Sequence, residues 1–432
     1  MKGKNVYLIM RNKRHKLLSL TLFLVPLLFT GFLKSESRET EGKYLLPFDL
    51  HNNLIIIDVS INKSKPLSFI LDSGVSDIII TELGFGDSLE LNYAKEIMVK
   101  GLGKGDPVKA YYSVMNEVTI GGITSTAQNI RVLMQDMFNL SKRMGRPIHG
   151  LIGYSVLKNY IVEIRYAQRR IILYEPDAYK KPKKRRAFTI PMEIEQTKPY
   201  IRATVNITSD STLPVKLFLD TGASHTLWLA EDCIDGICVP PDAVKKYLGA
   251  GLNGDITGHM SVIENLYFGG FKFNKMITSF PDKESVQNLF SVNNRNGSIG
   301  AEILRRFTIT FDYTRKEITF VPNRSLREAL YVNRAGFEIE MPVPDFPLYT
   351  VAFIEEGSPS WKAGLRTGDQ VLKINGENTL FMDFNEIIGF LYMKPGKTIK
   401  LEVSREGSNK SFHFQLEEPF TFPPLEVNSV RE

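Results

Sequence analysis

Short apolar stretches, many of them rich in β-branched residues, recur along most of this chain. Residues 54–61 read Leu-Ile-Ile-Ile-Asp-Val-Ser-Ile, and a second apolar run follows at residues 67–71. Such runs are typical of β-strands. The pattern predicts strands throughout residues 43–176. It predicts the same opening pair of strands again at residues 200–207 and 215–219.

The pattern changes near Gly336. Apolar residues between Asp383 and Tyr392 follow helical spacing, and Asp383 is placed to cap that helix. Strands are predicted on either side of it, at residues 349–354, 398–404 and 411–416. Residues 336–420 therefore form a separate small α+β unit in this interpretation.

Two of the predicted strands end in an aspartate within a tight turn. Residues 69–74 read Phe-Ile-Leu-Asp-Ser-Gly, and residues 217–222 read Leu-Phe-Leu-Asp-Thr-Gly. A Gly-Gly pair begins 49 positions after each aspartate, and a later glycine follows at 81 and 80 positions. Such self-similarity indicates one unit used twice, as paired lobes. The lobes are residues 43–176 and 187–322, joined by a basic linker at 177–186.

The paired aspartates, Asp72 and Asp220, carry the candidate chemistry. Two carboxyl groups about 3 Å apart cannot both ionise, so they share one proton. The ionised carboxyl can then activate a water, and the protonated one can polarise a carbonyl. The sequence does not assign the base to either residue. The alternative is two ordinary aspartates in strand-to-turn positions. Supporting residues in the turns are Ser73, Gly74, Thr221 and Gly222.

Each repeat also carries a glycine-rich hairpin about 30 positions after its aspartate, at residues 101–105 and 249–254. Such segments predict mobile lids over an extended substrate. Exposed β-turns are the alternative. No Gly-Lys-Ser/Thr follows, so phosphate binding is not indicated. The candidate lid residues are Gly101, Gly103, Gly251 and Asn253.

The net charge of +6 arises from the first 34 residues, which hold seven lysines and arginines and no acid. The remainder sums to about −1, so nucleic-acid binding is not indicated. An apolar run at residues 17–33 follows the basic start. We expect residues 1–34 to be a signal peptide or an uncleaved signal anchor that tethers the chain to a membrane. Either interpretation places the folded part outside the cytoplasm, in the periplasm or extracellular space.

The chain has two cysteines, Cys233 and Cys238, in one short loop. An oxidising compartment permits a disulfide between them, and two free thiols are the alternative. No His-Glu-x-x-His or Gly-x-Ser-x-Gly motif is present, so we expect no metal and no cofactor. For His225, which follows the second aspartate, we expect a local hydrogen bond.

Residues 43–322 resemble the aspartic peptidases, of both the pepsin-like and the retropepsin-like types. Asp72-Ser-Gly and Asp220-Thr-Gly match the paired catalytic motif, and residues 151–153 and 298–300 match the later hydrophobic-hydrophobic-Gly element. The resemblance implies two six-stranded, barrel-like β lobes in one chain, with a cleft for peptides or unfolded proteins. The pepsin type has a tyrosine at the tip of the first hairpin, whereas Tyr111 and Tyr112 of this chain lie after that hairpin. Val75 and Asp77, which follow the first aspartate motif, also depart from the residues usual in the family.

Residues 336–420 resemble a PDZ domain, on the signature of residues 357–369 and 371–376. PDZ domains capture a chain terminus by adding it to a sheet edge. By that resemblance, residues 346–349 form the carboxylate loop and residues 350–354 the receiving strand. The candidate residues are Pro347, Leu348 and Tyr349. The alternative is a PDZ domain that only packs on the lobes.

Three hypotheses follow. In the first, the chain is an exported, metal-independent aspartic endopeptidase that acts on extended polypeptides. In the second, the lobes are catalytically weak and the chain is a scaffold that binds peptides through its PDZ domain. In the third, the chain is a homodimer that uses only one of the two motifs, Asp72 or Asp220, in each site.

Overall fold

A computed structural model describes residues 42–84, 87–136, 138–183, 187–231, 236–290, 294–330, 332–420 and 425–429. All of them belong to one compact unit, Ser37–Glu432. The predicted signal segment, residues 1–34, lies outside the described residues. No described helix has the length and apolarity needed to cross a membrane.

The first repeat forms a closed barrel. Six strands follow one another by hydrogen bonding, and the ring closes because β3 also pairs with β7. β2 (Asp49–His51) and β6 (Tyr93–Val99) extend the sheet at its two ends. The ring consists, in spatial order, of β3 (Leu54–Ile61), β4 (Leu67–Leu71), β9 (Gly150–Ile152), β5 (Ile78–Ile80), β8 (Ile123–Leu133) and β7 (Val108–Ile120).

The second repeat forms the same ring, closed by pairing of β14 with β18. β13 (Glu193–Glu195) and β17 (Val244–Gly251) extend it as β2 and β6 extend the first ring. Its members, in the same order, are β14 (Lys198–Asn206), β15 (Leu213–Leu219), β20 (Gly297–Ile299), β16 (Leu227–Leu229), β19 (Phe271–Pro281) and β18 (Gly254–Phe268). The predicted duplication into two six-stranded lobes is therefore confirmed.

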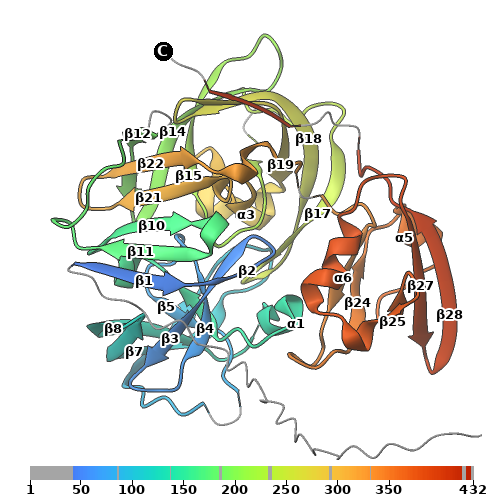
Figure 1. Cartoon of the computed structure of the whole chain (residues 1–432), viewed down its shortest axis with the longest axis horizontal. Coiled ribbons are helices and arrows are strands. Elements are labelled where there is room, and N and C mark those ends of the chain that lie inside the picture. Colours follow the sequence, from blue (N-terminus) through green and yellow to red (C-terminus); the bar gives the residue numbers. More distant parts are fainter. Residues whose placement is uncertain are drawn as a thin grey trace, which may run out of the picture. The chain divides into compact units, whose positions relative to one another are not determined.

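A third sheet joins the lobes (Figure 1). The two lobes meet in its middle, where Ile164 lies opposite Ile309 in an antiparallel pair. The side chains of this sheet and of both barrels contribute to one continuous buried core. Its strands, in spatial order, are β1 (Lys43–Pro47), β11 (Arg170–Tyr174), β10 (Ile161–Arg165), β21 (Phe307–Asp312), β22 (Glu317–Pro322) and β12 (Phe188–Pro191).

Four short helices and a 3-10 turn connect these strands. α2 (Tyr154–Leu157) and α4 (Ala301–Leu304) occupy equivalent places in the two repeats, directly after Gly153 and Gly300. The others are α1 (Leu140–Met144), η1 (Tyr166–Gln168) and α3 (Lys283–Phe290).

The predicted α+β unit has its own buried core. Its sheet has the order β23 (Phe337–Glu340), β24 (Tyr349–Ile354), β25 (Gln370–Ile374), β27 (Thr398–Arg405) and β28 (Ser408–Gln415), and β26 (Glu377–Asn378) pairs with β25. The predicted helix is α6 (Phe384–Leu391), capped by a reciprocal pair of bonds between Asp383 and Glu386. The remaining short helices are α5 (Pro359–Lys362) and η3 (Thr379–Phe381).

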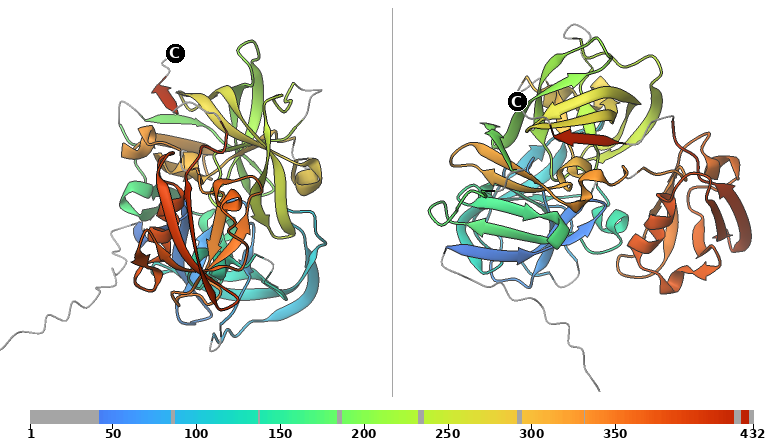
Figure 2. Two further views of the ribbon diagram at one scale, coloured as in Figure 1. Left: turned by 90° about the vertical axis from the view of Figure 1, so that its right-hand side faces the viewer. Right: turned by 45° about the horizontal axis from the view of Figure 1, so that its top comes forward.

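The chain returns to the second lobe after this unit, which the sequence pattern did not predict. β29 (Glu426–Ser429) pairs with the edge of β19, so that Val427 lies opposite Phe273 (Figure 2). Val427 is buried in the core of the lobes.

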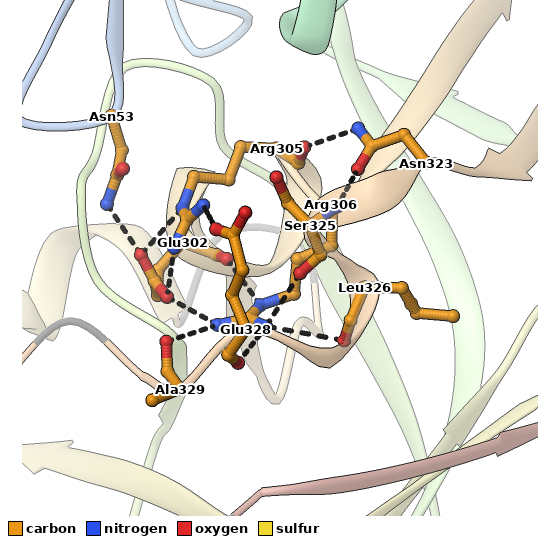
Figure 3. Close-up of polar contacts among 9 residues, drawn as sticks. All are labelled: Asn53, Glu302, Arg305, Arg306, Asn323, Ser325, Leu326, Glu328 and Ala329. Carbon is orange, nitrogen blue, oxygen red and sulfur yellow. Dashed lines mark hydrogen bonds and ion pairs between the residues drawn. The ribbon is translucent and has the colours of Figure 1, made fainter.

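A buried ionic network fixes the segment after the second barrel (Figure 3). The guanidinium of Arg306 is fully buried, and its Nη2 donates to Oε1 of Glu302 at 2.6 Å. The same guanidinium donates to four backbone carbonyls of the segment around η2 (Arg324–Arg327) and to that of Glu302. These bonds satisfy a charge that burial would otherwise penalise heavily.

The network also reaches the first lobe. Asn53, in the turn between β2 and β3, donates from Nδ2 to Oε2 of Glu302 at 2.7 Å. Arg305 donates to both carboxylate oxygens of Glu302 at 3.0 Å. Glu302 thus links the hairpin of one lobe to the helix α4 of the other.

We expect Arg306→Met to lower the free energy of unfolding by about 3–5 kcal/mol, because it removes one of the two cations that pair with the buried Glu302 carboxylate and leaves five backbone carbonyls without their donor. Urea unfolding followed by circular dichroism measures the change. The control is Asn159→Ala, at the position of the first repeat that corresponds to Arg306; Asn159 is exposed, so its replacement should change stability by less than about 0.5 kcal/mol. Equal effects of the two substitutions would contradict the structural role of the network.

Candidate active site

The two aspartate turns are hydrogen-bonded to each other across the lobes. The backbone N–H of Ser73 donates to Oγ1 of Thr221 at 3.0 Å, and the N–H of Thr221 donates to Oγ of Ser73 at 3.1 Å. Each hydroxyl also donates to the carbonyl that precedes the opposite aspartate, that of Leu219 at 2.5 Å and that of Leu71 at 2.9 Å. The two turns of one chain therefore form a single site.

Each aspartate continues the ladder of its strand before the chain turns. The N–H of Asp72 donates to the carbonyl of Ile152 at 2.8 Å, and that of Asp220 donates to Ile299 at 2.9 Å. The strands β9 and β20, which carry the hydrophobic-hydrophobic-Gly element, thus hold the two aspartate turns from one side. Gly153 fits this role because a Cβ there would overlap the backbone of Asp72.

The glycines of the two turns allow the carboxyl groups to come close to the opposite turn. A Cβ on Gly222 would overlap the carboxyl carbon of Asp72, so this carboxyl lies directly on the second turn. The N–H of Gly74 donates to Oδ1 of Asp72 at 2.7 Å, and that of Gly222 donates to Oδ1 of Asp220 at 3.1 Å. One oxygen of each carboxyl is thereby fixed.

Burial of the two carboxyl groups shifts their protonation. Desolvation raises the pKa of Asp72, against a smaller lowering by the N–H of Gly74. Desolvation and the charge of Asp72 raise the pKa of Asp220 to about 7. A pair of this kind keeps a shared proton up to near-neutral pH, which is the state that acid–base hydrolysis needs.

Two cations near the carboxyl groups were not among the residues singled out from the sequence. The positive charges of Lys198 and Arg295 both lower the pKa of Asp220, opposing the effect of burial. Lys198 is the first residue of β14, and Arg295 precedes β20. The strand pairing places them where the first repeat has Leu54 and Ile148.

The two glycine-rich hairpin tips, proposed as lids, contact each other. The side chain of Asn253 accepts from the N–H of Gly101 at 2.5 Å and donates to the carbonyl of Asp106. The backbone of Asn253 adds a bond from its N–H to Leu102 at 2.7 Å and accepts one from Gly105 at 2.6 Å. Cβ atoms on Gly103 and Gly251 would overlap the backbone of the opposite tip. All four candidate lid residues therefore lie at one junction.

Two further predictions concern the second lobe. Cys238 is disulfide-bonded, and its expected partner Cys233 lies outside the described residues. Nε2 of His225 lies 3.0 Å from Oγ of Ser298, and its ring stacks on Trp228 with centroids 4.5 Å apart. Burial lowers the pKa of His225 to about 3, so this histidine is neutral and structural.

The predicted peptide-binding strand of the PDZ-like unit is wrong. β24 pairs with β23 along its length and with β25 at Tyr349 and Thr350, so β24 is not an edge strand of the sheet. An added strand needs a free row of backbone groups, which an interior strand lacks. The strands at the two edges of this sheet are β23 and β28.

The candidate peptide-binding residues Pro347, Leu348 and Tyr349 were predicted as part of the loop before β24, so they do not precede an edge strand either. Tyr349 is the first residue of β24 and is buried, and its hydroxyl donates to the carbonyl of Met382 at 2.6 Å. Pro347 and Leu348 lie in the connection between β23 and β24. In the loop that precedes β23, the N–H groups of Ala335 and Gly336 donate to Oδ1 of Asn333.

Comparison with known families gives two matches. A family model described as aspartyl protease matches residues 57–156 and 203–300, one region in each lobe. A model described as PDZ domain matches residues 350–405. The first match includes both aspartate turns, and the second includes most of the separate α+β unit.

The curated relatives are similar over short stretches. The carboxy-terminal processing protease CtpA of Bacillus subtilis is 32% identical over 84 residues, which is 19% of this chain and 18% of that protein. The putative zinc metalloprotease LL2128 of Lactococcus lactis is 38% identical over 58 residues, 13% of each. The chain thus spans less than a fifth of these relatives. Among solved structures, the aspartic proteinase from Irpex lacteus has 13% identity and a TM-score of 0.43, covering 66% of this chain and 99% of that one.

The junction of the hairpin tips can be tested at one residue. Asn253→Ala removes the acceptor of the Gly101 N–H, so amide exchange at Gly101 should accelerate at least about tenfold. Hydrogen exchange followed by mass spectrometry measures this effect. Asn409→Ala, on an exposed strand of the PDZ-like unit, is the control and should leave residues 100–106 protected as in the wild type. Unchanged exchange in Asn253→Ala would show that the tips are held by other contacts.

Proposed function

The two lobes of this chain belong to the aspartyl protease family, and a PDZ domain follows them; on this premise we propose that the chain is an aspartic endopeptidase that cleaves extended or unfolded polypeptides. The observation that carries the proposal is the reciprocal bonding of Ser73 and Thr221, which brings two buried carboxyl groups into one site. The raised pKa of Asp220 supports the same conclusion.

The mechanism follows from the shared proton. The ionised member of the dyad accepts a proton from a bound water, which attacks the scissile carbonyl carbon. The protonated member donates a hydrogen bond to the carbonyl oxygen and then transfers its proton toward it. In the next step the carboxyl protonated by water gives its proton to the leaving amine, and the C–N bond breaks. The other carboxylate takes a proton back from a hydroxyl of the tetrahedral intermediate as the product C=O bond forms, so the dyad again holds one shared proton.

Export and terminus binding complete the proposal. The basic start and the apolar run at residues 17–33 support export, with the folded part in the periplasm or outside the cell and a membrane tether if the segment is not cleaved. A substrate or partner chain terminus would bind along the edge strand β23 of the PDZ domain, beside α6. No specific observation favours the scaffold hypothesis over hydrolysis.

Substitution of either catalytic carboxylate tests the proposal. Asp72→Asn and Asp220→Asn should each lower kcat/KM on a denatured protein at least about 100-fold, because the amide can neither share nor transfer the proton. Asp58→Asn, on an exposed position of β3, is the control with full activity. If the wild type cleaves no denatured protein between pH 3 and 7, the scaffold hypothesis replaces hydrolysis. If only one of the two substitutions, Asp72→Asn or Asp220→Asn, lowers kcat/KM, the homodimer hypothesis replaces the single intramolecular site.

The pH dependence of activity tests the shared proton. Burial raises the pKa of Asp220 to about 7, so the dyad loses its proton as the pH rises through that value. We expect kcat/KM to fall about tenfold per pH unit above pH 7, once the singly protonated form becomes the minor one. A profile of kcat/KM against pH, measured with one fluorogenic peptide, shows whether activity falls above pH 7 as expected. Constant activity up to pH 9 would contradict a shared-proton mechanism.

A further inference from the structure

The duplicated fold permits a residue-by-residue comparison of the two sides of the dyad. Side chains two positions apart on a strand point to the same face, so Ile70 shares the face of Asp72, and Phe218 shares that of Asp220. The strand pairing then identifies the neighbours on each face. They are Ile56 and Leu151 opposite Ile70, and Tyr200 and Ser298 opposite Phe218.

The face of the first lobe is apolar. A separate buried cluster joins Ile56, Ile70 and Leu151 to the residues that follow the turn and precede β9. Leu54 packs against this cluster at the start of β3, and Ile148 belongs to it two residues before Gly150. The residues of this face are apolar and buried, and Leu54 at its end is half-buried.

The same face of the second lobe is aromatic and cationic. The strand register places Lys198 where the first lobe has Leu54, and Arg295 where it has Ile148. The guanidinium carbon of Arg295 lies 5.4 Å from the ring centroid of Phe218. A Cβ on Gly74 would lie 3.2 Å from Cζ of Phe218, so this ring reaches the opposite catalytic turn. The cation is therefore separated from the dyad turns by one aromatic ring.

The ammonium of Lys198 is available for a ligand. It is partly buried, and within the described ranges it makes no hydrogen bond or ion pair. Its charge is felt by both catalytic carboxyls, whose pKa values it lowers. The dyad balances this charge through space, but the ammonium donates no hydrogen bond within the described residues. A carboxylate from the substrate would supply the acceptor.

We propose that the side of the site formed by the second lobe binds a carboxylate of the substrate next to the scissile bond, held by Lys198 beside the Arg295–Phe218 stack, while the first lobe binds an apolar side chain. This proposal rests on the proposed function and specifies its substrate class. The carboxylate has two possible sources, an aspartate or glutamate side chain and the C-terminal carboxylate of a short product-like chain.

Matched peptides distinguish the two sources. One series carries glutamate or glutamine at each position within two residues of the cleaved bond, with apolar residues elsewhere. A second series ends within two residues of that bond, with a free or an amidated C-terminus. We expect kcat/KM to favour the charged member of one series at least about tenfold over its neutral partner. The series that shows the preference identifies the source.

Substitutions at Lys198 test whether this residue causes the preference for the charged peptide. Lys198→Leu installs the residue of the first lobe and should reduce the charged-to-neutral ratio toward one, while the neutral peptide is still cleaved. Lys198→Arg keeps the charge and should keep the ratio. Binding of the same peptides to the Asp72→Asn variant, followed by fluorescence anisotropy, gives the ratio without turnover.

The outcomes separate this proposal from the proposed function. A wild type that treats charged and neutral peptides alike, in cleavage and in binding to Asp72→Asn, overturns the carboxylate site. So does a Lys198→Leu variant that moves the pH profile but keeps the ratio, because the lysine would then act only on the dyad. If no peptide is cleaved but binding retains a Lys198-dependent preference, the carboxylate site stands and the endopeptidase proposal fails.

Discussion

The reciprocal hydrogen bonds between Ser73 and Thr221 are the constraint on which the rest of the site depends. Each hydroxyl accepts the amide of the opposite turn and donates to the carbonyl ahead of the opposite aspartate. Only a residue with one donor and acceptor lone pairs on the same atom can do both. The four bonds fix the two turns face to face, and the missing Cβ of Gly222 leaves space for the Asp72 carboxyl.

Duplication supplies this symmetry, but the two lobes are joined by contacts that differ. In the first lobe, the hairpin turn at Asn53 donates to the buried carboxylate of Glu302. In the second, the equivalent turn at Thr197 shares a hydrogen bond of 2.5 Å with Ser76, four residues after Asp72. One link is ionic and buried, whereas the other is neutral. The backbone arrangement was thus kept while the side chains diverged.

The sequence predicted the features that depend on local pattern or on repetition. The strands at residues 54–61 and 67–71, the helix capped by Asp383 and the two matched lobes all follow from spacing along the chain. It did not predict β29, whose four residues make sense only against the edge of β19. The edge of the PDZ sheet was misplaced for a related reason. An apolar strand pattern indicates burial, which is highest for interior strands such as β24.

Sequence analysis did not identify Lys198 and Arg295, because neither belongs to a recognisable motif and their proximity to the dyad depends on the folded structure. Burial raises the pKa of Asp220 from 3.8 to about 7, so the folded chain binds more protons than the unfolded chain between these values. Stability from this group is therefore lost as the pH rises from about 4 to 7. Lys198 and Arg295 oppose that loss by favouring the ionised form. Two cations of the second lobe thus offset part of the cost of burying the acidic pair at neutral pH.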